Sequence, residues 1–166
     1  MRTSTKRALA PLAVAGALVL TGLPPATADH YPPFELPENT ACTFPLGVSA
    51  TGGKLHTKTW YDEKGDPVRS ITAGRGDVVT YTNLDTGAFL SLKTGGNVER
   101  KTYHPDGSQT VTMTGQGGLI FFPSDEPPGP STTHYFGRVV YTIGTDGVWT
   151  LVSTSGRERD ICAELA

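Results

Sequence analysis

Glycine and proline interrupt this chain so often that no long helix fits between them. The sequence contains 20 glycines and 13 prolines, and no stretch after residue 41 keeps a helical repeat of apolar residues. Short runs rich in Thr, Val, Ile and aromatic residues instead alternate with turn signals such as Asp85-Thr86-Gly87 and Pro105-Asp106-Gly107. Turns of this kind join antiparallel neighbours into hairpins. The pattern therefore predicts an all-β fold, built as an antiparallel meander.

Most of the predicted strands end at a glycine, a proline or an Asp-Gly turn. They cover residues 44–51, 54–62, 68–73, 77–84, 88–94, 97–104, 108–115, 119–122, 134–143, 148–153 and 159–164. A sheet of about eight to ten such strands cannot stay flat and open without leaving exposed edges. We therefore expect the sheet to close into a β-barrel, with a two-sheet β-sandwich as the alternative.

The two cysteines of the chain, Cys42 and Cys162, lie far apart in the sequence. In an exported protein, an even pair without a Cys-x-x-Cys spacing indicates a structural disulfide rather than a redox site. Closing so long a loop stabilises a fold by roughly 4–5 kcal/mol in the chain-entropy model. We expect this bridge to hold the first and last strands together, as closure of a barrel requires.

The N-terminal sequence indicates export. Basic residues precede an apolar stretch over residues 8–23, and Ala26-Thr27-Ala28 is typical of a signal-peptidase site. The apolar stretch is short for a membrane span, and it contains proline and glycine. The sequence thus predicts a signal peptide over residues 1–28, cleavage after Ala28, no membrane span in the mature chain, and secretion to the extracellular space.

Removal of residues 1–28 leaves 138 residues, enough for one domain. We expect residues 29–41, which contain three prolines, to form an extended tail, and residues 42–166 to form a single β-barrel domain. The removed segment holds three of the 14 basic residues, which leaves 11 against 16 acidic ones and a net charge of about −5. Nucleic acids and anionic membranes bind basic surfaces. The charge therefore argues against both as partners.

Local patterns indicate which segments are covered. In residues 108–115, Val111 and Met113 alternate with threonines, which predicts one buried and one solvated face. Residues 119–122 are apolar on both faces, so we expect another part of the chain to cover them. The loop over residues 123–133 contains four prolines, which predicts a rigid surface feature rather than a mobile lid. Its neighbouring acids, Asp125-Glu126, are interpreted as solvated turn residues.

Several segments, taken in order, resemble a known group of sequences. They are Cys42-Thr43-Phe44-Pro45, the strand and turn over residues 78–87, residues 120–130, residues 135–140 and residues 155–163. Together they are similar to a family of uncharacterised small secreted proteins from actinobacteria, across the chain from Cys42 onward. The resemblance implies secretion, one disulfide and a β-rich fold. It implies no catalytic residue, because the family carries no established activity.

No catalytic motif stands out. The sequence lacks a Gly-x-Ser-x-Gly elbow, a Ser-x-x-Lys pair, a His-Glu-x-x-His motif and a calcium loop. His56, His104 and His134 lie near predicted strand ends, where three separate solvated histidines are a better interpretation than one metal site. Arg75-Gly76-Asp77 is interpreted as a turn before a strand, and its match to an integrin-binding tripeptide as coincidence. We therefore predict no catalytic residue, no metal and no cofactor.

Aromatic residues give the strongest signal for a binding site. Most of them lie on predicted strands, where they either line a cavity or fill a narrow barrel. We favour filling. In the other case, aromatic rings would hold a small apolar ligand and nearby polar groups would orient it. The candidate ligand-binding residues are Tyr81, Asn83, Tyr135, Arg138, Tyr141 and Trp149.

The sequence thus predicts a secreted extracellular β-barrel domain with a non-catalytic binding or structural role. The alternative is a barrel whose apolar cavity binds or isomerises a small hydrophobic compound. A secreted hydrolase ranks last, because no motif supports it. Folds of this type host both binding and catalytic functions, so the fold class alone does not decide between them.

Overall fold

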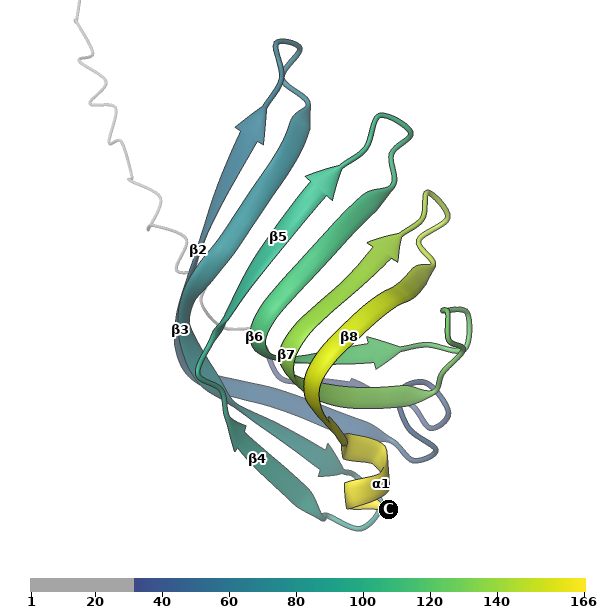
Figure 1. The fold of residues 1–166 in the computed structure, drawn as a ribbon. Coiled ribbons are helices and arrows are strands. Elements are labelled where there is room, and N and C mark those ends of the chain that lie inside the picture. Colours follow the sequence, from purple (N-terminus) through teal and green to yellow (C-terminus); the bar gives the residue numbers. More distant parts are fainter. Residues whose placement is uncertain (1–31) are drawn as a thin grey trace, which may run out of the picture.

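The computed structural model describes residues 32–166, so the predicted signal peptide and its cleavage site lie outside the described residues. The chain forms one antiparallel sheet of eight strands and ends in a short helix (Figure 1), which confirms the all-β prediction. The elements are β1 (Phe34–Leu36), β2 (Leu46–Tyr61), β3 (Pro67–Asn83), β4 (Phe89–Lys93), β5 (Asn97–Tyr103), β6 (Gln109–Phe121), β7 (Ser131–Ile143), β8 (Trp149–Asp160) and α1 (Ile161–Leu165).

The sheet is open. Its strands lie in the order β1-β2-β3-β5-β6-β7-β8, and β4 pairs with β3 alone. Strands β1 and β8 are the two ends of this order, and no pairing joins them within residues 32–166. The prediction of a closed β-barrel is therefore wrong, and the single sheet instead curls into a half-barrel (Figure 1). The meander itself is confirmed, because most strands pair with the next strand in the chain.

Two features keep the sheet from closing. Strand β3 pairs with β5 through residues 69–73 and with β4 through residues 78–82, so β4 and β5 share one edge of β3. Of these two strands, only β5 also pairs with β6. Strand β4 therefore ends its own branch of the sheet beside β3. Strand β8 then ends at Asp160, and α1 turns inward against β3, β4 and β7. The chain thus leaves the sheet at α1 and adds no further strand within the described residues.

The predicted disulfide is confirmed. The Cα atoms of Cys42 and Cys162 lie 5.4 Å apart, and the bridge joins the segment before β2 to α1 rather than one strand to another. Residues 159–164, predicted as a strand, form the end of β8 and helix α1. Asp160 caps this helix, because its Oδ1 accepts a hydrogen bond from the amide of Ala163 at 2.9 Å.

The segment predicted as an extended tail is partly paired. Its residues 34–36 form β1, which lies antiparallel to the start of β2. Ala41, at the end of the same segment, is fully buried, and its carbonyl oxygen accepts a hydrogen bond from Thr132 Oγ1 at 3.0 Å. The described part of this segment therefore belongs to the domain, and it links β2 to β7.

A row of glycines crosses the sheet where its strands bend. Gly115 pairs with Gly137, and Gly137 pairs with Gly156. A Cβ atom at Gly137 would lie 2.0 Å from the carbonyl oxygen of Ser155, and Gly156 has a φ of +99°, which residues with a side chain rarely adopt. Close backbone approach therefore excludes side chains here. Strands β6, β7 and β8 bend at this row without breaking (Figure 1).

The bend divides the sheet into two parts. On one side, three hairpins with tips at residues 62–66, 104–108 and 144–148 project in the same direction (Figure 1). We call this part the hairpin sheet, and it consists of residues 54–75, 97–116 and 136–157. The other part, which we call the base, contains β1, β4, α1 and the remaining halves of the long strands.

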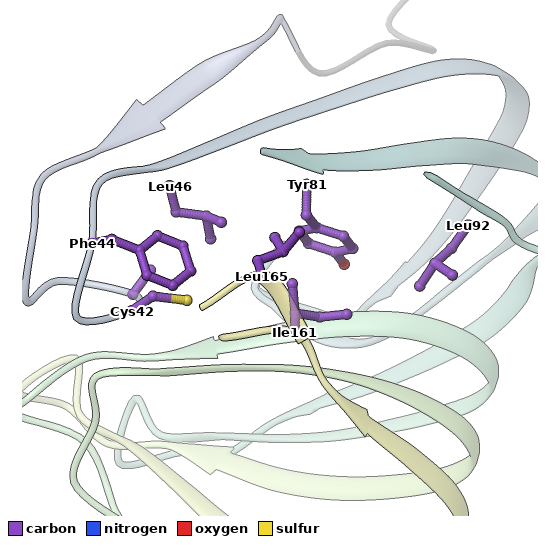
Figure 2. Close-up of a cluster of buried hydrophobic side chains, with 8 residues drawn as sticks. Cys42, Phe44, Leu46, Tyr81, Leu92, Ile161 and Leu165 are labelled. Carbon is purple, nitrogen blue, oxygen red and sulfur yellow. The ribbon is translucent and has the colours of Figure 1, made fainter. Parts of the chain in front are cut away.

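Two apolar clusters stabilise the base and the bend. The first lies between β3, β4 and α1 (Figure 2) and contains Ala41, Cys42, Phe44, Leu46, Tyr81, Leu92, Ile161 and Leu165. The second comes from both sides of the bend in β6 and β7 and contains Val111, Met113, Leu119, Phe121, Tyr135, Val139 and Tyr141. Ile120 packs against the first cluster, while its neighbours join the second. The prediction that residues 119–122 are covered on both faces is confirmed for residues 119–121.

The loop after β6 is fastened to the edge of β8. Asp125 is 5% exposed, and its carboxylate accepts hydrogen bonds from the amides of Phe122 at 2.7 Å and Trp149 at 3.0 Å. The backbone of Glu126 adds two further hydrogen bonds to β8. The interpretation of Asp125 as a solvated turn residue is therefore wrong. It is a buried acceptor that fixes the loop, because a carboxylate can satisfy two amides at once.

Candidate functional site

The structure does not bring the six candidate ligand-binding residues into one cavity. Tyr81 belongs to the first cluster, where its hydroxyl lies 3.2 Å from Nδ1 of His134. Asn83 is also buried, and its amide donates a hydrogen bond to the carbonyl of Leu165 at 3.0 Å, while its Oδ1 accepts one from the amide of Asp85. Both side chains therefore connect β3 to neighbouring segments of the base.

The other four candidates do not share one face: Arg138, Tyr141 and Trp149 lie on the hairpin sheet, and Tyr135 lies on the base side of the bend. Tyr135 and Tyr141 are buried in the second cluster, and Trp149 stacks on Tyr141 with ring centroids 4.8 Å apart. Arg138 is exposed on the opposite face, since its neighbour Val139 points into that cluster. The buried rings pack in the two apolar clusters of an open sheet and not inside a barrel. A role of these six residues in ligand binding stays a prediction.

The three histidines considered for a metal site are separate. His56 is exposed on β2, and His104 lies at a hairpin tip with its Nε2 2.8 Å from Thr110 Oγ1. His134 is fully buried in β7, so the interpretation of the three as solvated histidines is wrong for His134. No cluster of three or more His, Cys, Asp or Glu side chains suited to a metal ion occurs within residues 32–166.

His134 on β7 and Tyr81 on β3 form a buried polar contact within the base. Nε2 of His134 has no hydrogen-bond partner among the described residues. Burial lowers the pKa of His134, and Arg159 lowers it further, while Asp77 partly opposes them. Burial also raises the pKa of the Tyr81 hydroxyl, to which Asp77 contributes. Both groups are therefore held in their neutral forms near pH 7.

Arg75-Gly76-Asp77 lies inside β3, so the interpretation of this tripeptide as a turn before a strand is wrong. Asp77 pairs with Gly52 across the sheet, and its Oδ1 accepts a hydrogen bond from Thr94 Oγ1 at 2.9 Å. A shallow surface pocket of about 400 Å³ borders the tripeptide, and a second of about 270 Å³ lies around Arg157. Neither pocket is lined by any of the six candidate residues.

The outward face of the hairpin sheet carries the clearest chemical pattern of the molecule. Successive side chains of a strand point to opposite faces, and the strand pairing fixes which ones share a face. Val111 and Met113 point into the second cluster, so Thr110, Thr112 and Thr114 point outward, which confirms the division predicted for residues 108–115. Residues that pair across neighbouring strands share a face, so the pairing assigns further residues to the outward side. They are residues 54, 56, 58, 60, 69, 71, 73, 75, 98, 100, 102, 116, 136, 138, 140, 142, 150, 153, 155 and 157.

Every side chain with a fixed charge on this outward face is basic. We call the surface the basic face, and all its cationic residues are exposed: Lys54, Lys58, Arg69, Arg75, Arg100, Arg138 and Arg157. None of them forms an ion pair within residues 32–166. The next acidic residue on this side of β3 is Asp77, beyond the glycine row and bonded to Thr94.

Hydroxyl groups share the basic face with these cations. Thr102 pairs with Thr110, Thr110 pairs with Thr142, and Thr142 pairs with Thr150, so four threonines form one row across four strands. Apart from Asp77, the acidic residues near the hairpin sheet lie on its other face or at the tips. Asp106, for example, is occupied in its own turn by Ser108, whose hydrogen bonds lower the pKa of the Asp106 carboxyl.

Two aromatic rings of the basic face are covered by cations. The guanidinium of Arg69 lies 4.2 Å from the ring centroid of Trp60, and Nζ of Lys58 lies 5.0 Å from it. Arg157 lies 5.6 Å from the ring centroid of Phe136 in the same way. Such contacts hold the long basic side chains over the sheet.

Sequence reasoning missed the basic face because it considered only the net charge of the chain. The alternation of Thr and apolar residues in β6 gives one strand of the face, but only the register shows which cations lie beside it. Comparison with protein-family models, curated proteins and solved structures finds no match to this chain. No helix within residues 32–166 has the length and apolar character needed to cross a membrane.

Proposed function

We propose that this protein is a secreted, non-catalytic binding domain and that the basic face is its binding surface. The observation that carries the proposal is the separation of charge: exposed cations lie on one face of the hairpin sheet, and no carboxylate lies among them. A chain with more acidic than basic residues would not show this separation if its charges served only to keep it in solution.

The rest of the fold supports a binding role over a catalytic one. The buried aromatic residues are packed in two clusters, and the buried His134 is enclosed in the base. General acid–base chemistry needs a titratable group within reach of a substrate. The exposed cations, by contrast, are placed on strands of a paired sheet, which holds them at fixed spacings.

Secretion is part of the same proposal. The disulfide and the basic N-terminal segment followed by an apolar stretch suit an exported chain that begins at Asp29 and belongs to the actinobacterial family it resembles. The intact mass of the protein from culture medium tests this part. We expect the mass of residues 29–166 less two hydrogen atoms, and a mass that includes residues 1–28 would contradict it.

Cation-exchange chromatography tests the binding surface, because a sulfonated resin is a simple polyanion. At pH 7 and low salt, the mature protein should be retained despite its negative net charge. The double variant Arg100→Gln/Arg138→Gln should elute at clearly lower salt. The control Lys64→Gln/Lys93→Gln removes two exposed cations from a hairpin tip and from β4, so it should elute like the unmodified protein. Equal elution of the two double variants would refute the proposal.

A further inference from the structure

We infer that the ligand of the basic face is an acidic polysaccharide, a polymer that carries both anionic groups and many hydroxyls. This inference rests on the function proposed above and names the chemical class of the ligand. It follows from the size of the face, the groups that lie on it and the groups that it lacks.

The size of the face suits a polymer rather than a single small anion. Cations occur from β2, which carries Lys58, to β8, which carries Arg157. Neighbouring strands lie about 4.8 Å apart, so the five strand spacings from β2 to β8 measure about 24 Å. Arg100 and Arg138 lie two strands apart, which is about 10 Å across the sheet. A monovalent anion reaches one such cation, whereas a chain with repeated charges reaches several.

The groups on the face match a hydroxylated polyanion. Arginine outnumbers lysine, and a guanidinium binds carboxylate, sulfate or phosphate oxygens through two parallel hydrogen bonds. The threonine row formed by Thr102, Thr110, Thr142 and Thr150 lies in line with Arg69, and further hydroxyls lie beside the other cations: Thr112 pairs with Arg100, and Arg138 pairs with Thr114 and Ser155. A hydroxyl both donates and accepts hydrogen bonds, so it suits the hydroxyls of a sugar between its charged groups.

The face lacks the features that single-stranded nucleic acids require. Proteins that bind single strands use exposed aromatic rings on which the bases stack. Here Trp60 is covered by Arg69 and Lys58, and Phe136 is covered by Arg157. A DNA duplex carries one charge about every 1.7 Å. The net negative charge of the mature chain therefore repels a duplex more strongly than it repels a polysaccharide with a lower charge density.

The face also lacks the features of a membrane-binding surface. Interfacial binding requires apolar side chains that enter the lipid next to the cations. The aliphatic residues of the basic face are all half-buried or buried: Ile71, Ala73, Val98 and Val140. An anionic bilayer would therefore contact charges and hydroxyls alone.

The test measures binding of the mature protein to defined probes by isothermal titration calorimetry. The probes are polygalacturonate, dextran sulfate, neutral dextran, galacturonate monomer, a 20-base-pair DNA duplex and vesicles containing phosphatidylglycerol. We expect binding to polygalacturonate, dextran sulfate or both, which distinguishes a carboxylated from a sulfated ligand. Neutral dextran and the monomer should show no measurable heat, because the first lacks charge and the second reaches too few cations.

Substitutions locate the binding and count the charges involved. Arg100→Gln/Arg138→Gln should weaken binding about ten-fold or more and reduce the slope of log K against log salt concentration by about 1.4, the value for two charges on a flexible chain. The control Lys64→Gln/Lys93→Gln should bind within two-fold of the unmodified protein. Both double variants should keep the thermal unfolding temperature of the parent, because the substituted residues are exposed.

The outcomes separate this inference from the proposed function. Tighter binding to DNA or to vesicles than to either charged polysaccharide would overturn the ligand class while leaving the basic face as the binding surface. Retention on the sulfonated resin without binding to either polysaccharide would do the same. Equal polysaccharide binding by the two double variants would overturn both, because the basic face would then not be the site.

Discussion

Acid is expected to destabilise this fold through one side chain, His134. The ring is fully buried between β7 and β3, its Nε2 has no partner among residues 32–166, and burial lowers its pKa below the ordinary value of 6.5. In the unfolded chain His134 therefore binds a proton near pH 6.5, whereas in the folded chain it stays neutral at that pH. Stability is fully present above that pH and falls as the pH drops towards the lowered pKa of the folded state.

The magnitude follows from this difference in proton uptake. One proton bound only by the unfolded chain changes the free energy of unfolding by at most about 1.4 kcal/mol per pH unit. Integrated from pH 8 to pH 5, the loss reaches up to about 2 kcal/mol when the folded ring stays neutral throughout. Carboxylates contribute mainly below this range, because their ordinary pKa values lie near 4.

Urea unfolding followed by tryptophan fluorescence at several pH values between 5 and 8 measures the effect. His134→Gln removes the titrating group and keeps an acceptor for Tyr81, so its stability should change little over this range. The control His104→Gln removes an exposed histidine at a hairpin tip and should keep the full dependence on pH. If His134→Gln lost as much stability as the parent between pH 8 and pH 5, the reasoning would be refuted.

Three further predictions concern stability and are measured by denaturant unfolding. Gly137→Ala should cost about 1–3 kcal/mol, because its Cβ would lie 2.0 Å from a carbonyl oxygen of β8; an unchanged midpoint would contradict the role of the glycine row. Asp125→Asn should cost about 1.5–3 kcal/mol, since the two amides bond to different oxygens of the buried carboxylate and one of these becomes an NH2 donor, and faster proteolysis within residues 122–130 should accompany it. Replacing both Cys42 and Cys162 by Ser should cost about 5 kcal/mol for a bridge across 120 residues; a loss below about 1 kcal/mol would mean that α1 stays in place without it.

The strand content and the disulfide could be predicted from the sequence because both depend on local signals. Asp-Gly turns mark the hairpins, and the two cysteines of the chain have only each other as partners for a disulfide within it. The glycines at 52, 74 and 115 were harder to interpret, because glycine both ends strands and bends them. The segments 44–51 and 54–62, predicted as two strands, belong to the single strand β2, from Leu46 to Tyr61. In the same way, 68–73 and 77–84 belong to β3, from Pro67 to Asn83, and 108–115 and 119–122 belong to β6, from Gln109 to Phe121. Only the partner across the sheet distinguishes the two cases.

The open sheet could not be predicted, because it depends on a five-residue helix. Nothing in the composition of residues 161–165 excludes a strand. The N-cap at Asp160 and the burial of Ile161 and Leu165 in the first cluster favour a helix there instead. The basic face could not be predicted either, because it depends on which strands lie side by side. Arg100 and Arg138 are 38 positions apart in the sequence, and they share a surface only because β6 lies between their strands.

The glycine row also affects how such a protein can change over generations. The cations and hydroxyls of the basic face belong to neither apolar cluster, so substitutions among them leave the interior intact. The glycines of the bend have no such freedom, because their neighbours occupy the space of any side chain. A lineage with this architecture can therefore acquire a new ligand by exchanging surface residues of the hairpins, while the bend beneath them stays fixed.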